Sequence, residues 1–582
     1  MRPGMRRAVW LTLAIAINAI FIAVSQAQTN SCISSTDGFW DEARLWSLAE
    51  PPSIRQSAIL ITNAASETVT IDGITASSFT NTLTITNLGI STDTLYLDNT
   101  GTVALHILNS LTIGISFNSL GDEFSIGGEL ISTNSTLIID GLSGGQIQDN
   151  GTIAIVGGSL IATNCSFQLA VSADNTSAGF LIVSNGLVQA RDVAVASNPG
   201  SGSGGIQVIG GTMTVSSSLT LGVVTGGGGG YGSLLIANGG LLAVTNGYTF
   251  IDSGTMTVSN GTFLGTGMSL ATFHSFGELV INNGTVTLSG GLGIAAGDVC
   301  DGSVTLNGGR LVVTNATIDA GDETSNGQLN VLDGTFLGQG IFLLGGGQLS
   351  IQGGISILSS DLGLGFGGTF YVSGGQLFVT NAPIFIDAGF SQSIVSGGLL
   401  AANYVEVGGS CCSGQLSVNG GSLTASTGVT VGNCASYLKV DGGQLIVTNA
   451  AHTGFIDVQG QLILSNGVLR VNKLVMTNSC SSFVHTGGKL IVGSVVLDPN
   501  EFTITSVARE GNDLRVTWMM GPGQTNALQV SKGGSHGKYV TNNFKDIFIV
   551  TNNTTAGTLT NYLDIGAATN FPSRYYRARL AP

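Results

Sequence analysis

The sequence predicts an all-β fold, a parallel β-solenoid built as a coil of short strands, on three observations. A GGxLxVTN motif occurs four times at nearly equal intervals, which indicates stacked copies of one structural unit. Apolar residues alternate within each unit, as in half-buried strands. With 88 Gly, 9 Pro and 9% charged residues, the composition fits turn-rich strands around a buried interior. The motif copies begin at Gly239, Gly308, Gly374 and Gly442.

Residues 1–27 are typical of a secretory signal peptide. Arg2, Arg6 and Arg7 precede an apolar run over residues 10–24, and small residues allow cleavage after Ala27. An uncleaved anchor is the alternative, although a run of about fifteen residues is short for a membrane span. No later segment is predicted to span a membrane once this peptide is removed. We therefore expect a bacterial extracytoplasmic protein, secreted or at the cell surface.

Residues 28–140 are predicted to form an N-terminal cap and the first, irregular rungs. Trp40 and Trp46 are expected to lie buried in this cap, and a sugar-binding platform is their alternative role. The segments around these tryptophans, Pro51–Pro52 and the GGxLxVTN units resemble bacterial autotransporter-associated β-strand repeat proteins, over residues 37 to about 495. The resemblance implies an extracellular right-handed β-helix of the pectate-lyase-like kind. No translocator barrel is expected, because the remaining residues are too few for one.

Residues 141–498 are predicted to be the regular solenoid, with about 22–25 residues per rung. Weaker Gly-Gly and Asn-Gly copies divide the long repeat into three units of similar length. Alternating pairs such as Leu377 and Val379 mark one strand of each rung, and a second apolar run such as Val405 and Val407 follows it. We expect two or three strands per turn. The finer copies begin at Gly374, Gly397, Gly420, Gly442, Asn466 and Gly487.

Residues 499–582 are predicted to form a small antiparallel β-sandwich. The composition changes near Pro499, since residues 141–490 contain six basic residues and residues 499–582 contain eight. Longer alternating strands follow, with Trp518 and a Tyr575–Tyr576 pair. This module resembles a fibronectin type III-like domain, with Trp518 in the second strand and the tyrosines in the penultimate one.

The charge argues against nucleic acid as a partner. The formal net charge is −15, and loss of the three arginines of the signal peptide lowers it to −18. A chain of this charge repels phosphate backbones.

One acidic cluster is a candidate calcium site. Asp298 and Asp301 have the same spacing as Asp319 and Asp322 further along the chain, so the pairs Asp298/Asp319 and Asp301/Asp322 are predicted to stack on adjacent rungs. Solvated turns are the alternative interpretation. Polysaccharide lyase chemistry would also need a base, and only Arg310 lies near in the sequence. No cofactor other than Ca²⁺ is expected.

The seven cysteines suggest a disulfide in an oxidising compartment. Cys412 and Cys434 occupy the same turn one rung apart, at a separation that a disulfide can span, so we predict that they are bonded. Cys411 is the rival partner. Buried thiols are the alternative, and the spacing does not indicate a zinc site.

The sequence leads to three functional hypotheses. The first is a non-enzymatic secreted or cell-surface β-solenoid with a structural, adhesive or matrix-contact role. The second is a carbohydrate-binding scaffold without turnover, and the third is a polysaccharide lyase or hydrolase of the β-helix type. Polysaccharides or surface and matrix components are the partners that these hypotheses imply.

Overall fold

The structure is a computed structural model that describes most of the chain in two compact units, residues 1–356 and 357–582. Strand accounts for 63% and helix for 2% of it, which confirms the all-β fold class. Outside the described residues lie 1–27, 63–65, 80–82, 118–122, 126, 143, 172–177, 198–201, 223–229, 273, 388, 390–391, 410–411, 479, 498–503, 521–523, 534–542, 554–557, 571–572 and 582. The predicted signal peptide therefore lies outside them.

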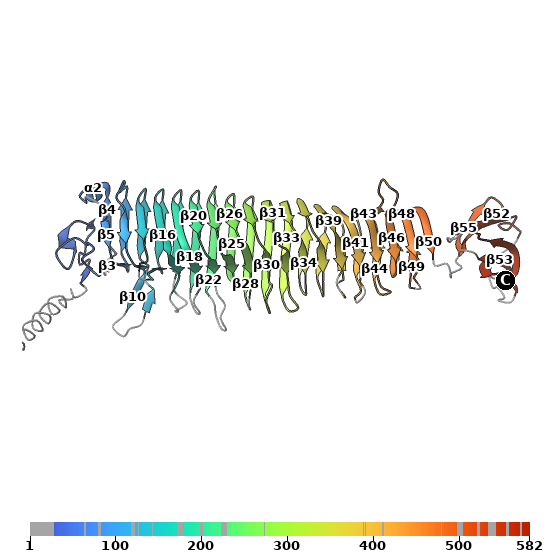
Figure 1. The fold of residues 1–582 in the computed structure, drawn as a ribbon, viewed down its shortest axis with the longest axis horizontal. Helices are drawn as coiled ribbons and strands as arrows, with labels where there is room; N and C mark the ends of the chain where they lie inside the picture. The colour runs from blue at the N-terminus through green and yellow to red at the C-terminus, as the bar shows by residue number, and fades with distance from the viewer. Residues whose placement is uncertain are drawn as a thin grey trace, which may run out of the picture. The chain divides into compact units, whose positions relative to one another are not determined.

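The first unit is a parallel β-solenoid with three strands per turn. Each strand pairs with its counterpart in the next turn, so three ladders run along the unit, and the strands lie side by side in Figure 1. The alternation seen in the sequence places every second side chain inside. In β12, for example, Leu130 is buried and Ile131 faces outward. Stacked Leu, Ile and Val side chains thus form a continuous core.

The bounds of the strands of the first unit follow ladder by ladder. The first ladder contains β2 (Gly38–Phe39), β4 (Thr68–Asp72), β7 (Thr94–Asp98), β12 (Glu129–Thr133), β15 (Thr152–Val156), β17 (Ala178–Ser184), β19 (Ser203–Ile209), β22 (Tyr231–Ala237), β25 (Ser253–Ser259), β28 (Phe276–Asn282), β31 (Asp301–Val313), β33 (Asn326–Gly338) and β35 (Gln348–Ile351). The second contains β5 (Leu83–Ile85), β8 (Leu105–Ile107), β13 (Thr136–Ile139), β16 (Ser159–Leu169), β18 (Leu187–Val195), β20 (Thr212–Val215), β23 (Leu241–Val244), β26 (Thr262–Gly265), β29 (Thr285–Leu288) and the ends of β31 and β33. The third contains β1 (Thr29–Ser31), β3 (Ala58–Ile61), β6 (Leu88–Ile90), β9 (Leu111–Ile113), β14 (Gln146–Asp149), the ends of β16 and β18, β21 (Leu219–Leu221), β24 (Tyr248–Ile251), β27 (Gly267–Leu270), β30 (Leu292–Ile294), β32 (Ile318–Ala320) and β34 (Ile341–Leu343).

The N-terminal turns carry the cap that the sequence predicts. Trp40 and Trp46 are 0% and 1% exposed, and their rings meet edge to face with centroids 5.2 Å apart. The indole Nε1 of Trp46 donates a hydrogen bond of 3.0 Å to the carbonyl of Trp40. Both tryptophans are therefore packing residues, and the sugar-platform alternative for them is wrong. The N-terminal turns also contain a 3₁₀ helix (Ala43–Leu45), α2 (Gly73–Ser77) and an antiparallel pair formed by β10 (Ile115–Phe117) and β11 (Glu123–Ser125).

The second unit begins with a solenoid of the same three-ladder design. Its strands are β37 (Leu362–Leu364), β38 (Thr369–Val372), β39 (Gln376–Ile386), β40 (Gln392–Val395), β41 (Leu399–Val407), β42 (Gln415–Val418), β43 (Ser422–Val431), β44 (Tyr437–Val440), β45 (Gln444–Val447), β46 (Phe455–Val458), β47 (Gln461–Leu464), β48 (Val468–Met476), β49 (Ser482–His485) and β50 (Lys489–Leu497). Strand β36 (Ile355–Leu358) contains the boundary between the units.

The register of the second unit confirms the finer repeat. In the ladder from β39 to β50, the residues that pair with one another all occupy the same position in their repeat copies. Each is the third residue of its predicted copy. This works because each Gly-Gly or Asn-Gly pair occupies the same turn immediately before a strand. The stacked positions are Gln376, Leu399, Ser422, Gln444, Val468 and Lys489.

The C-terminal part of the second unit is the predicted antiparallel sandwich. One three-stranded sheet contains β51 (Ile504–Glu510), β52 (Asp513–Met520) and β55 (Thr558–Asp564), and the other contains β53 (Thr525–Lys532), β54 (Lys545–Thr551) and β56 (Arg574–Leu580). Trp518 is buried between them, against Phe548 of the opposite sheet with ring centroids 6.0 Å apart. The likeness to fibronectin type III domains stays a prediction.

Candidate functional site

The predicted stacking of acidic residues is wrong. Asp301 pairs in register with Asn326 and not with Asp322, and Asp319 pairs with Gly293 and not with Asp298. The similar segments GDVCDG (residues 297–302) and IDAGDE (residues 318–323) lie at turns of unequal length. Residues that correspond when the two segments are aligned by sequence therefore do not pair in the ladders. Asp301 Oδ1 instead accepts a hydrogen bond of 2.8 Å from Asn326 Nδ2.

Two of the remaining acids, Asp298 and Asp322, lie in turns, whereas Asp319 lies in β32. Asp322 lies between β32 and β33, and its Oδ1 accepts a hydrogen bond of 2.6 Å from the backbone N–H of Glu323. Asp298 lies between β30 and β31. Burial raises the pKa of Asp319 above its usual value. Within the part of the chain that the structure describes, no three His, Cys, Asp or Glu side chains are grouped so that they could hold a metal. The arrangement favours the alternative of solvated turns.

The predicted disulfide between Cys412 and Cys434 is also corrected, because Cys434 is bonded to Cys480 with Cα atoms 5.2 Å apart. These two residues are two rungs apart, since β44 pairs with β47 and β47 pairs with β49. The intervening turn is only residues 459–460, whereas residues 432–436 and 477–481 make longer turns on either side. The longer turns meet across the short one, which a count of rungs alone does not reveal. Cys411 lies outside the described residues.

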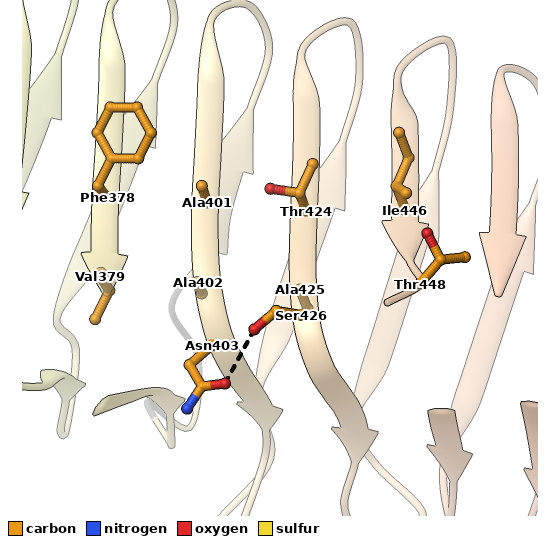
Figure 2. Close-up of a pocket in the computed structure, with 10 residues that line it drawn as sticks. All are labelled: Phe378, Val379, Ala401, Ala402, Asn403, Thr424, Ala425, Ser426, Ile446 and Thr448. Carbon is orange, nitrogen blue, oxygen red and sulfur yellow. Dashed lines mark hydrogen bonds between the residues drawn. The ribbon is translucent and has the colours of Figure 1, made fainter. Parts of the chain in front are cut away.

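A hollow lies on the outer face of the second unit, over β39, β41, β43 and β45. Outward side chains stack there in one row, in which the small Ala401 and Thr424 lie between the larger Phe378 and Ile446 (Figure 2). The small pair leaves a hollow of about 370 Å³. Its lower rim is polar, and there Ser426 Oγ donates a hydrogen bond of 3.0 Å to Asn403 Oδ1 (Figure 2).

The hollow continues along the same row. A second one of about 360 Å³ shares Thr448 with the first and reaches Arg470 and Ile491 on the next two rungs. We call the two together the trough. The part shown in Figure 2 is lined without a charged side chain, and the trough runs across the rungs.

The neighbouring ladder of the same unit presents a second group of side chains, which we call the aromatic face. It comprises two outward columns. One places Tyr404, Gly428 and Phe455 on successive rungs, and the other places Phe385, Glu406, Thr430 and Asp457 on successive rungs. The columns lie on one strand surface because outward side chains alternate with buried Val405, Val429 and Ile456.

The rings of the aromatic face meet across a glycine. Tyr404 and Phe455 have centroids 6.4 Å apart although two rungs separate them, because Gly428 between them has no side chain. A Cβ at Gly428 would lie 2.7 Å from Cζ of Phe455. Phe455 therefore covers the glycine of the rung before it. This arrangement also shields the glycine backbone, which is its structural role.

The hydroxyl and the carboxylates of this face differ in their hydrogen-bond partners. Tyr404 donates a hydrogen bond of 2.6 Å from its hydroxyl to Thr430 Oγ1. Burial raises the pKa of Tyr404, the bond to Thr430 opposes the rise, and the charges of Glu406 and Asp457 add to it. The Asp457 carboxylate accepts a hydrogen bond of 2.9 Å from Gln459 Nε2. None of the described residues donates a hydrogen bond to the Glu406 carboxylate.

Glu406 lies between two hollows. One of about 120 Å³ is lined by Phe385, Asp387 and Gly409 as well as Glu406. The other, of about 410 Å³, is lined by Glu406, Thr430 and Gln459 and lies beside the disulfide at Cys434. Gly408, Gly409 and Gly432 complete the linings and contribute no side chains that could fill the space. The arrangement places a carboxylate, a hydroxyl and an amide around an open space beside aromatic rings.

Sequence reasoning did not single out Tyr404, Glu406 or Phe455. The second apolar run of each rung would have revealed them in the sequence. Aligning these runs at Val405, Val429 and Ile456 places the residues of both outward columns in register.

The comparisons with known proteins leave the site to be interpreted from its own geometry. No protein-family model matches the sequence, and no curated protein or solved structure is significantly similar to it. Across the described residues, no helix is both long and apolar enough to cross a membrane.

Proposed function

We propose that this protein is a secreted or cell-surface β-solenoid with a non-enzymatic, adhesive or matrix-contact role. The trough is the observation that carries the proposal. It aligns outward side chains from successive rungs, about 4.8 Å apart, into one open, weakly charged surface. An extended matrix polymer lying across the rungs would contact side chains of several rungs at once.

Two further observations support this role. The Cys434–Cys480 bond is of the kind that persists in oxidising compartments, which supports export. The trough also lacks the usual elements of hydrolytic chemistry, since the residues around Ala401 and Thr424 supply no carboxylate. We therefore propose contact without turnover.

Cosedimentation of the full chain with insoluble polysaccharide particles, such as cellulose and chitin, tests the proposal. We expect the protein to pellet with at least one polymer, and Thr424→Arg to reduce the pelleted fraction about fivefold or more because the longer side chain fills the hollow. Ile463→Arg is the matched control, because Ile463 faces outward on β47 of another ladder. A chain that stays in solution with every polymer, or equal losses in both variants, contradicts the role.

A carbohydrate-binding scaffold without turnover is the second candidate, and the aromatic face favours it. Aromatic rings pack on the apolar faces of sugars, carboxylates accept hydrogen bonds from sugar hydroxyls, and side-chain amides both accept from and donate to these hydroxyls. The two candidates agree if the matrix polymer is a polysaccharide.

A further inference from the structure

We propose that the aromatic face is a binding site for an uncharged glycan, held at Tyr404, Phe455 and Glu406 beside the hollow under the disulfide. The inference rests on the carbohydrate-binding candidate proposed above, and it names the residues that hold the ligand and narrows the ligand to uncharged glycans. It is independent of the trough, which lies on the neighbouring ladder.

The aromatic face pairs two rings with an unused acceptor. Tyr404 and Phe455, whose ring planes are inclined by 49°, form a tilted aromatic platform that spans two rungs. Glu406, the next outward residue of β41 after Tyr404, lines both hollows. No described residue donates a hydrogen bond to its carboxylate. Pyranose rings present apolar C–H faces and hydroxyl donors side by side, so a platform next to a free acceptor matches both surfaces of a sugar.

The larger hollow has the shape of a small-ligand site. The space of about 410 Å³ beside Glu406 is open because three glycines line it, and it continues past Thr430 to Gln459 and Asn478. Its far side is formed by the turns that Cys434 and Cys480 join, so the bond holds the rim in place. A volume of a few hundred Å³ is in the range of small-ligand sites and accommodates one or two sugar rings.

The negative charge of the aromatic face selects the class of glycan. Glu406 and Asp457 belong to the face, and Asp387 lines the smaller hollow, whereas the cation in register with Phe455 is Lys473 on the next rung. The whole chain has a formal net charge of −15. Carboxylates repel polyuronates and accept hydrogen bonds from neutral hydroxyls, so the site favours an uncharged chain.

Affinity electrophoresis of the full chain through gels that contain hydroxyethyl cellulose or polygalacturonate tests the proposal. We expect retardation by the neutral glucan only. Glu406→Gln, which preserves shape, should weaken binding roughly tenfold because a charge-assisted hydrogen bond is lost, and Phe455→Ala should weaken it by a similar factor. Circular dichroism checks that both variants are folded. Tyr248→Ala is the matched control, since Tyr248 is an aromatic residue of the first unit that is 48% exposed.

Three outcomes overturn the inference. Equal retardation of all variants places glucan binding elsewhere, and retardation by polygalacturonate alone reverses the predicted charge preference. An absence of retardation in both gels excludes the glycan site, while cosedimentation that is sensitive to Thr424→Arg would leave the matrix-contact role intact. Loss of that sensitivity, with Glu406-dependent glucan binding retained, would support the aromatic face as the binding site and contradict the role of the trough.

Discussion

At the residue scale, a buried carboxyl at a corner of the coil links stability to pH. Asp149 ends β14 and is fully buried, and its Oδ1 accepts a hydrogen bond of 2.8 Å from the backbone N–H of Gly151. Burial raises the pKa of Asp149 to about 8, and hydrogen bonds from the backbone of Gly151 and Phe180 oppose only part of that rise. The carboxyl is therefore protonated inside the fold at neutral pH.

This carboxyl makes local stability depend on pH. Its pKa is raised above the unfolded value of 3.8, so its contribution is fully present below pH 4 and is lost as the pH rises to about 8. The opening free energy at Gly151, measured by hydrogen exchange, should fall across this window by up to about 1.4 kcal/mol per pH unit. Asp149→Asn keeps the acceptor and should remove the dependence. A profile that is flat in the unmodified protein contradicts the prediction.

At Gly428, the addition of a single Cβ atom is expected to weaken glycan binding. The backbone of this glycine is compatible with alanine, but a Cβ would lie 2.7 Å from the end of the Phe455 ring. Because that ring can swing away, we expect Gly428→Ala to change the melting temperature little and to weaken binding of the neutral glucan several-fold. Retained affinity would show that the ring position is unimportant.

At the element scale, the lengths of the turns decide which residues meet. The disulfide joins turns two rungs apart because the turn between them is shorter than either. Chain-entropy arguments give about 4 kcal/mol of stabilisation for a bond closing a loop of this length. Reduction, or Cys480→Ser, should therefore lower the stability of the last rungs of the solenoid.

Peptide mapping under non-reducing conditions checks the pairing directly. The fragment that contains Cys434 should be linked to the fragment that contains Cys480, and melting curves with and without reductant measure the stabilisation. A link from Cys434 to Cys412 would contradict the structure.

The same dependence on turns explains which features the sequence could predict. The rung steps from Gln376 to Lys489 were predictable because a Gly-Gly or Asn-Gly pair precedes each strand. The position of Asp319 was not, because the turns beside it differ in length and its strand pairs with Gly293. Tyr404 and Phe455 come together only through the register across Gly428, which depends on aligning the second strand of each rung.

At the scale of the whole molecule, a stacked fold is expected to open locally. Each turn contacts mainly its neighbours, so stability is a sum of terms from adjacent turns. Trp46→Ala should remove about 3–5 kcal/mol of packing from the N-terminal cap because the side chain is fully buried.

Hydrogen exchange resolved along the chain measures where that loss occurs. Protection should fall in the first rungs, near β3 and β4, and stay unchanged in the second unit. A uniform loss over all the described strands would contradict local opening and indicate one cooperative unit.

The central claim is that the molecule holds a polysaccharide on its outer surface without cleaving it. Incubating the full chain with a panel of neutral and acidic polysaccharides, with and without Ca²⁺, and recording bound protein and released oligosaccharide together tests that claim most directly. The account predicts calcium-independent retention on a neutral polymer with no released product. Release of oligosaccharides, above all a calcium-dependent release that Asp301→Asn abolishes, would contradict it.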